Sequence, residues 1–188
     1  MGRGRFSLRI MNLETERLKI RYLRPDDLED FFAFRSDPEV CRYQGYPPIT
    51  YEHARGFLDD LQTKEFGVAG QWVQLALELK FHGKVIGDIG LKPEPNIRIV
   101  EFGISMSRDY QGKGLATEGL QAVIFHLFRE LGVHRVIGLA DVDNARSIAL
   151  MRRLGFRREG DFRKSYFDQG VWRDECLHAV LAEEWIRR

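Results

Sequence analysis

A glycine-rich turn, about two-thirds of the way along the chain, constrains the fold more than any other feature. An alternating apolar segment, Ile99 to Met106, leads into Gln111-Gly112-Lys113-Gly114, and a helical apolar stripe follows within Gly112 to Leu131. Glycines allow backbone N–H groups to approach a ligand without a Cβ in the way. The unpaired N–H groups and the dipole at a helix start favour phosphate groups. We therefore expect a strand–turn–helix unit that binds a phosphorylated ligand, with a turn that only reverses the chain as the alternative.

Two common phosphate-binding loops do not fit this turn. A Walker A loop needs Gly, four residues and then Gly-Lys-Ser/Thr, but Ser107 stands at the first glycine position and Gly114 follows Lys113. A Rossmann fingerprint needs a third glycine where Thr117 stands, and it should follow the first strand of its domain. The turn therefore belongs to neither class.

The order of the predicted elements indicates a mixed α/β fold. Pro25-Asp26-Asp27 opens a first helix, and Thr50 is placed to cap a second helix that continues through Leu61. The segment from Pro38 to Pro48 reads as a loop. Antiparallel hairpins then precede a strand–helix–strand–helix unit. The predicted strands are Thr15 to Leu23, Trp72 to Leu79, Lys84 to Leu91, Ile99 to Met106, Val136 to Ala140, Phe162 to Phe167 and Val171 to Leu181, with a further helix over Asn144 to Leu154.

The length, charge and cysteine content of the chain limit the kind of protein that it can be. The 188 residues suffice for one domain that folds without metals or disulfides. A net charge of +1 provides no global field toward nucleic acid or a membrane, so we expect neither as a partner. Cys41 and Cys176 stand far apart in no metal-like spacing, which predicts no metal site and fits a reducing cytoplasm. We expect residues 1–12 to be a flexible leader, with translation starting at Met1 or Met11, and residues 13–188 to be one domain.

Short motifs spread over the chain resemble one family. Gln111-x-x-Gly114-x-Ala116 matches the acetyl-CoA motif of the GNAT superfamily of N-acetyltransferases. From Leu13 onward the sequence resembles the RimJ/RimL-like branch, the ribosomal-protein N-terminal acetyltransferases and their relatives. The segments that carry this resemblance are Leu13-Glu14-Thr15-Glu16-Arg17-Leu18, Val85-Ile86-Gly87, Glu101-Phe102-Gly103-Ile104, Asn144-x-x-Ser147, Leu154-Gly155-Phe156 and Glu159-Gly160.

The resemblance implies a fold and a way of binding coenzyme A. The fold is a mixed, mostly antiparallel sheet of six to seven strands, with a V-shaped splay between two parallel central strands and about four flanking helices. Pantetheine would lie in the splay between Gly103–Met106 and Val136–Ala140, and an N–H near Met106 would bind the oxyanion. The residues implied to bind acetyl-CoA are Ile104, Ser105, Met106, Gln111, Gly112, Lys113, Gly114, Leu115, Ala116, Thr117, Asn144, Ser147, Arg152 and Arg153.

Three residues are candidates for the chemistry of acyl transfer. The attacking amine must be neutral, so we expect Glu101 to act as the base, directly or through water. Ser147 resembles a serine that serves the leaving thiolate in the RimL-like branch. Many family members carry a tyrosine where Met151 stands here, and Tyr166 is the weaker substitute. A surface carboxylate for Glu101 and helix N-terminal hydrogen bonding for Ser147 remain the alternatives.

The acceptor is left open among three possibilities. These are a protein N-terminus or lysine, a small amine such as an aminoglycoside, polyamine or amino acid, and no acceptor at all in a non-catalytic CoA-binding module. A deep acidic pocket would favour the small amine and an open groove a peptide. We expect a monomer or homodimer whose acceptor wall comes from segments 35–50 and 162–172, with the aromatic residues Tyr43, Tyr46, Phe162, Tyr166, Phe167 and Trp172.

Overall fold

One eight-stranded sheet runs through the molecule in the order β1-β2-β3-β4-β5-β6-β8-β7. The computed structural model describes residues 12–168 and 170–186, so the expected leader lies outside the described residues except for Asn12. Neighbouring strands are antiparallel except for β5 and β6, which are parallel. The strands are β1 Leu13–Glu14, β2 Leu18–Tyr22, β3 Val73–Leu79, β4 Val85–Pro93, β5 Ile99–Met106, β6 Arg135–Asp141, β7 Arg157–Asp168 and β8 Val171–Leu181.

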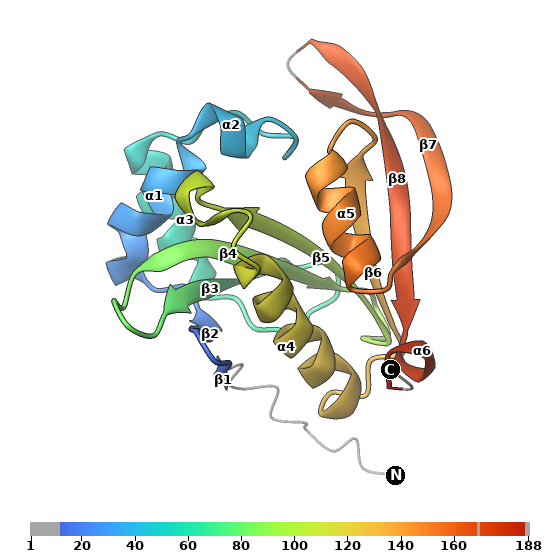
Figure 1. Ribbon diagram of the computed structural model, residues 1–188. Helices are drawn as coiled ribbons and strands as arrows, with labels where there is room; N and C mark the ends of the chain where they lie inside the picture. Colours follow the sequence, from blue (N-terminus) through green and yellow to red (C-terminus); the bar gives the residue numbers. More distant parts are fainter. Residues whose placement is uncertain (1–11, 169, 187–188) are drawn as a thin grey trace.

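Helices cover both faces of this sheet (Figure 1). In β3, Leu75 and Leu77 join the core under α4 and α5, whereas the intervening Ala76 joins the core under α1 and α3. Successive strand residues face opposite sides, so the two helix pairs lie on opposite faces. No helix among the described residues is long and apolar enough to cross a bilayer. The helices are α1 Leu28–Arg35, α2 Pro38–Cys41, α3 Tyr51–Leu61, α4 Leu115–Arg129, α5 Ala145–Arg153 and α6 Ala182–Ile186, with 3₁₀ turns at Pro25–Asp27 and Arg108–Tyr110.

The parallel strands β5 and β6 separate along their length. Their pairing runs only from Ile99 with Arg135 to Phe102 with Gly138. Beyond that point β5 remains paired with β4 through Met106, and β6 remains paired with β8 through Asp141. The expected V-shaped splay between two parallel central strands is therefore present.

The predicted mixed α/β fold is confirmed, with small differences in the elements. The sheet has eight strands instead of six to seven, because the two-residue β1 is too short to show a periodic pattern. Within the expected loop, Asp37 caps the short helix α2, whose first residue is Pro38, a favoured start. Strand β7 begins at Arg157, earlier than predicted, because its first residues are polar and lack apolar alternation.

Candidate active site

An open groove of about 1280 Å³ lies where β5 and β6 separate. Its walls are α2 with the turn after it, the second half of β5, the glycine turn with the start of α4, the end of β6, and α5. Most of the predicted acetyl-CoA ligands line it. Those that do are Ile104, Ser105, Met106, Gln111, Gly112, Gly114, Leu115, Ala116, Thr117, Asn144, Ser147 and Arg153.

The start of α4 opens into the groove without a side-chain cap. Gly112 and Gly114 have φ of 74° and 79°, a left-handed conformation that glycine adopts without a steric penalty. Gly114 is the N-cap residue, and no side chain among the described residues accepts from the first turn. The N–H groups of Leu115, Ala116 and Thr117 are therefore available, with the helix dipole behind them. This arrangement fits a pyrophosphate.

The splayed part of β5 presents backbone groups to the groove. The Ser107 N–H donates to Ile86 in β4 over 2.9 Å. Because hydrogen bonds alternate along a strand, the backbone groups of Ser105 also face β4, and those of Ile104 and Met106 face the gap. An extended pantetheine chain could pair with these two residues as an added strand would.

Two glutamines reach the carbonyl groups on this edge. Gln44, in the turn after α2, donates from Nε2 to the Ile104 carbonyl over 3.1 Å. Gln111 donates from Nε2 to the Met106 carbonyl over 2.9 Å and accepts from Arg146 over 2.7 Å. Gln111 therefore connects the end of β5 to α5 through its side chain. The sequence predicted only the backbone role of Gln111, and it included Gln44 only as part of the acceptor wall expected over residues 35–50.

The start of α5 forms the opposite wall of the groove. Asn144 caps the helix by accepting from the Ser147 N–H over 3.1 Å, so the predicted ligand Asn144 also has a structural role. Arg153 lines the groove and donates to the Thr117 hydroxyl over 3.3 Å, bridging α5 and α4. Arg152 does not line the groove. Of the two arginines implied at the 3′-phosphate, Arg153 is therefore the better placed.

Two residues between β1 and β2, Thr15 and Arg17, connect that segment to the glycine turn and the start of α4. Arg17 donates to the Lys113 carbonyl over 3.0 Å and to Glu118 over 2.7 Å, and the Thr15 hydroxyl donates to Glu118 over 2.5 Å. Burial raises the pKa of Glu118, but the hydrogen bonds from Thr15 and Arg17 outweigh this and hold the pKa below its ordinary value. The Lys113 side chain does not line the groove, and its Nζ lies 5.3 Å from the Tyr110 ring centroid.

The predicted residues Glu101 and Tyr166 lie outside the groove. Glu101 is ion-paired with Lys92 over 2.5 Å. Tyr166 donates its hydroxyl proton to Asp141 over 2.7 Å. Burial and this hydrogen bond raise the pKa of Tyr166. The Tyr166 proton is thus directed at a carboxylate of the protein.

A polar cluster that sequence reasoning missed lies behind β5. Arg35 in α1 is ion-paired with Asp88 in β4 over 2.5 Å and also donates to the Tyr46 hydroxyl. Tyr46 in turn lies 3.3 Å from the Ser105 hydroxyl. Complete burial raises the pKa of Asp88, and the Arg35 guanidinium opposes that rise. A carboxylate within the apolar strand β4 was the one sequence signal for this cluster, since a buried charge needs a partner.

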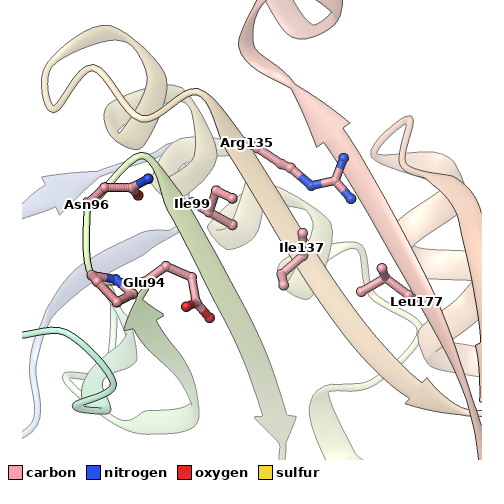
Figure 2. A pocket seen from close by; sticks show the side chains of 7 residues that line it. Glu94, Asn96, Ile99, Arg135, Ile137 and Leu177 are labelled. Carbon is pink, nitrogen blue, oxygen red and sulfur yellow. The ribbon is translucent and has the colours of Figure 1, made fainter.

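A second, smaller hollow of about 400 Å³ lies over the paired first halves of β5 and β6, beside β8 and the turn before β5 (Figure 2). Figure 2 shows Ile99, Ile137 and Leu177 lining it, with Glu94 and Arg135 also around it. Arg135 is ion-paired with Glu159 over 2.6 Å. None of the predicted site residues lines this hollow, so the large groove is the candidate active site.

Comparisons with known proteins agree with this geometry. A family model for the acetyltransferase (GNAT) domain matches residues 17–157. The uncharacterized N-acetyltransferase YnaD of Bacillus subtilis (strain 168) is 31% identical over 93% of this chain and 99% of its own length. The crystal structure of an acetyltransferase (GNAT family) from Bacillus anthracis has a TM-score of 0.82 and 29% identity, covering 92% of this chain and 99% of its own.

Two further relatives act on different amines. The ribosomal protein uS5-alanine N-acetyltransferase of Escherichia coli (strain K12) is 37% identical over 45% of this chain and 43% of its own length. The spermidine N(1)-acetyltransferase of the same strain is 27% identical over 90% of this chain and 88% of its own. The fold, the splayed strands and the family match lead to one conclusion: the chain is an N-acetyltransferase that belongs to the GNAT acetyltransferase family.

Proposed function

We propose that the protein transfers an acetyl group from acetyl-CoA directly to the N-terminal amine of a peptide or protein. One observation supports acetyl-CoA as the acetyl donor. The uncapped start of α4 and the unpaired edge of β5 both lie in the same groove. Backbone N–H groups from Gly112 to Ala116, with the Thr117 hydroxyl, would bind the pyrophosphate, since the Gln111 N–H donates to the Arg108 carbonyl over 3.2 Å. Pantetheine would pair with Ile104 and Met106, and Arg153 would reach the 3′-phosphate.

The charge of the groove favours a peptide over a polyamine. Four arginines line it, Arg42, Arg108, Arg146 and Arg153. Three carboxylates line it as well, and each lies within 4 Å of an arginine. These pairs are Glu39 with Arg42 at 3.8 Å, Glu118 with Arg17 at 2.6 Å, and Asp143 with Arg173 at 3.9 Å. A polycation would therefore find no unpaired carboxylate among these residues.

The mouth of the groove has room for an extended chain. The groove reaches from α2 and Tyr43 on one side to α5 on the other. The β7–β8 hairpin projects beyond α5 (Figure 1) and exposes Phe167, Val171 and Trp172, which are 58%, 53% and 56% accessible. These side chains do not line the groove, so they would contact only peptide residues beyond the N-terminal one.

The protein residues at the groove supply what acyl transfer requires. An α-amine has an ordinary pKa of about 7.7–8.0 and a lysine about 10.4, so an α-amine needs little help to become neutral. The Met106 N–H would donate to the thioester oxygen, and the Ser147 hydroxyl would serve the departing sulfur. Glu101 would accept the amine proton only through water, because its carboxylate lies outside the groove.

The test is acetylation of a mixed amine panel with acetyl-CoA, read by mass spectrometry of the products. The panel contains peptides with free N-termini, the same peptides with blocked N-termini and one internal lysine, spermidine and an aminoglycoside. We expect the free N-termini to be modified fastest. Modification of spermidine alone would support the small-amine alternative, and calorimetric binding of CoA without any product would support a non-catalytic module.

A further inference from the structure

Three side chains behind β5, Arg35, Tyr46 and Ser105, form a hydrogen-bonded series. Arg35 has only donors, so the Tyr46 hydroxyl oxygen must accept from Arg35 Nη1. The Tyr46 proton is then free for the Ser105 oxygen, 3.3 Å away. Either hydroxyl of this pair can donate to the other. When Tyr46 donates, Ser105 keeps its own hydroxyl proton and can donate it to another partner.

Several contacts hold the Arg35 guanidinium that donates to Tyr46. Its second terminal nitrogen is ion-paired with the fully buried Asp88 over 2.5 Å. Its guanidinium carbon lies 5.0 Å from the ring centroid of Tyr46 and 5.4 Å from that of Phe31. An ion pair and two aromatic contacts thus restrict the guanidinium, and through it the Tyr46 hydroxyl.

Gln44, close to Ser105, offers a hydrogen-bond acceptor. Gln44 Nε2 donates to the Ile104 carbonyl, which assigns the nitrogen of this amide and leaves its oxygen, Oε1, as an acceptor. Gln44 and Ser105 both line the groove, and they flank Ile104 at the splay. Gln44 thus brings a hydrogen-bond acceptor to the residue that precedes Ser105.

We propose that Gln44 and Ser105 together recognise the α-aminoacyl unit of the acceptor substrate. Gln44 Oε1 accepts from the amine N–H, and the Ser105 hydroxyl donates to the carbonyl oxygen of the same residue. The inference rests on the proposed N-terminal acetylation and adds its specificity determinant. A polyamine offers only N–H groups or cations near its amine, so it leaves the Ser105 proton unpaired. An α-aminoacyl group satisfies both side chains.

The test compares a peptide with its alkene isostere, in which a C=C bond replaces the first peptide bond and removes only the recognised carbonyl. We expect the wild-type protein to have a kcat/KM at least about tenfold higher for the peptide, the effect of one lost hydrogen bond to a buried donor. Ser105→Ala should bring this ratio close to one. Tyr46→Phe, which keeps the Ser105 hydroxyl but removes the group that orients it, should give an intermediate ratio.

Gln44→Ala provides a second, different signature. Both substrates carry the amine, so this variant should lower kcat/KM for both and keep their ratio. Thr63→Val is the matched control, because its hydroxyl is exposed beyond the end of α3 and donates only to the Asp60 carbonyl. It should leave the ratio as in the wild type.

The outcomes separate this inference from the proposed function. Equal wild-type rates on the peptide and its isostere would overturn the recognition of the carbonyl, while acetylation of peptides would still stand. A ratio that Ser105→Ala leaves at the wild-type value would overturn the role of Ser105. Acetylation of spermidine but neither peptide substrate would overturn the proposed acceptor itself. The wild-type ratio needs no variant to fold, so the proposal can fail on that measurement alone.

Discussion

The side-chain amide of Gln111 donates to the Met106 carbonyl over 2.9 Å, at the point where β5 leaves β6. The same side chain accepts from Arg146 on α5 over 2.7 Å. Gln111 thus connects two walls of the groove through its side chain, while its backbone N–H donates to the Arg108 carbonyl over 3.2 Å. A family motif residue therefore has a structural reason for being glutamine.

Replacing Gln111 should weaken the binding of CoA. Gln111→Ala removes both hydrogen bonds, so we expect the Kd to rise about tenfold, whereas Arg146→Met removes one and should raise it less. Gln111→Glu should be the most damaging, because a carboxylate cannot donate to the Met106 carbonyl. Isothermal titration calorimetry with CoA measures all three. Unchanged affinity in Gln111→Ala would contradict the bridging role.

Glu118 should stabilise the protein only above acidic pH. Its folded-state pKa is depressed, so its contribution is present above the unfolded value of about 4.3 and disappears as the pH falls through the lower folded value. We expect Glu118→Gln to lower the melting temperature at pH 7, and the difference from the wild type to shrink as the pH approaches 3. Glu16→Gln, at a neighbouring exposed position, is the control and should change little at any pH. A difference that stays constant with pH would contradict the ionic role of Glu118.

Gly114 and Gly56 make a matched pair of glycine substitutions. Gly114 has φ of 79°, so Gly114→Ala should cost about 1 kcal/mol of stability and also weaken CoA binding by displacing the turn. Gly56 lies inside α3, and a Cβ there would have no atom within 4 Å. Gly56→Ala should therefore stabilise the protein by up to about 1 kcal/mol without changing CoA affinity. Chemical denaturation and calorimetry test both, and a stabilising Gly114→Ala would show that the left-handed turn is not required.

The elements that local signals define could be predicted from the sequence. Strand β5 has the predicted bounds, Ile99–Met106, because its apolar residues alternate. Thr50 accepts from the His53 N–H over 3.3 Å and caps α3, as its residue type suggested. The glycine turn could be located for the same reason, since its glycines and the helix after it are adjacent in the sequence. These features depend on neighbours within a few residues.

The polar contacts around β5 could not be predicted in this way. Arg35, Tyr46, Asp88 and Ser105 come from four separate segments, and only the folded sheet brings them together. Their spacing in the sequence has no period that could reveal a cluster. The polar residue types of Gln44 and Tyr46 are equally compatible with an exposed loop. Tertiary packing decides which of these side chains face the groove.

Glu101 provides the last test, because its proposed role as a base conflicts with its position beside Lys92. If the Glu101 carboxylate accepts the amine proton through water, Glu101→Gln should lower kcat most at pH 7, where an α-amine is largely protonated, and least at pH 9, where it is already neutral. Lys92→Met is the control, because it removes the ion pair over 2.5 Å but keeps the carboxylate, so it should retain most of the activity. Initial rates from pH 6.5 to 9.5 on a free N-terminal peptide distinguish the two. Equal losses in both variants at every pH would assign Glu101 a structural role on the sheet, and the α-amine would then lose its proton directly to solvent.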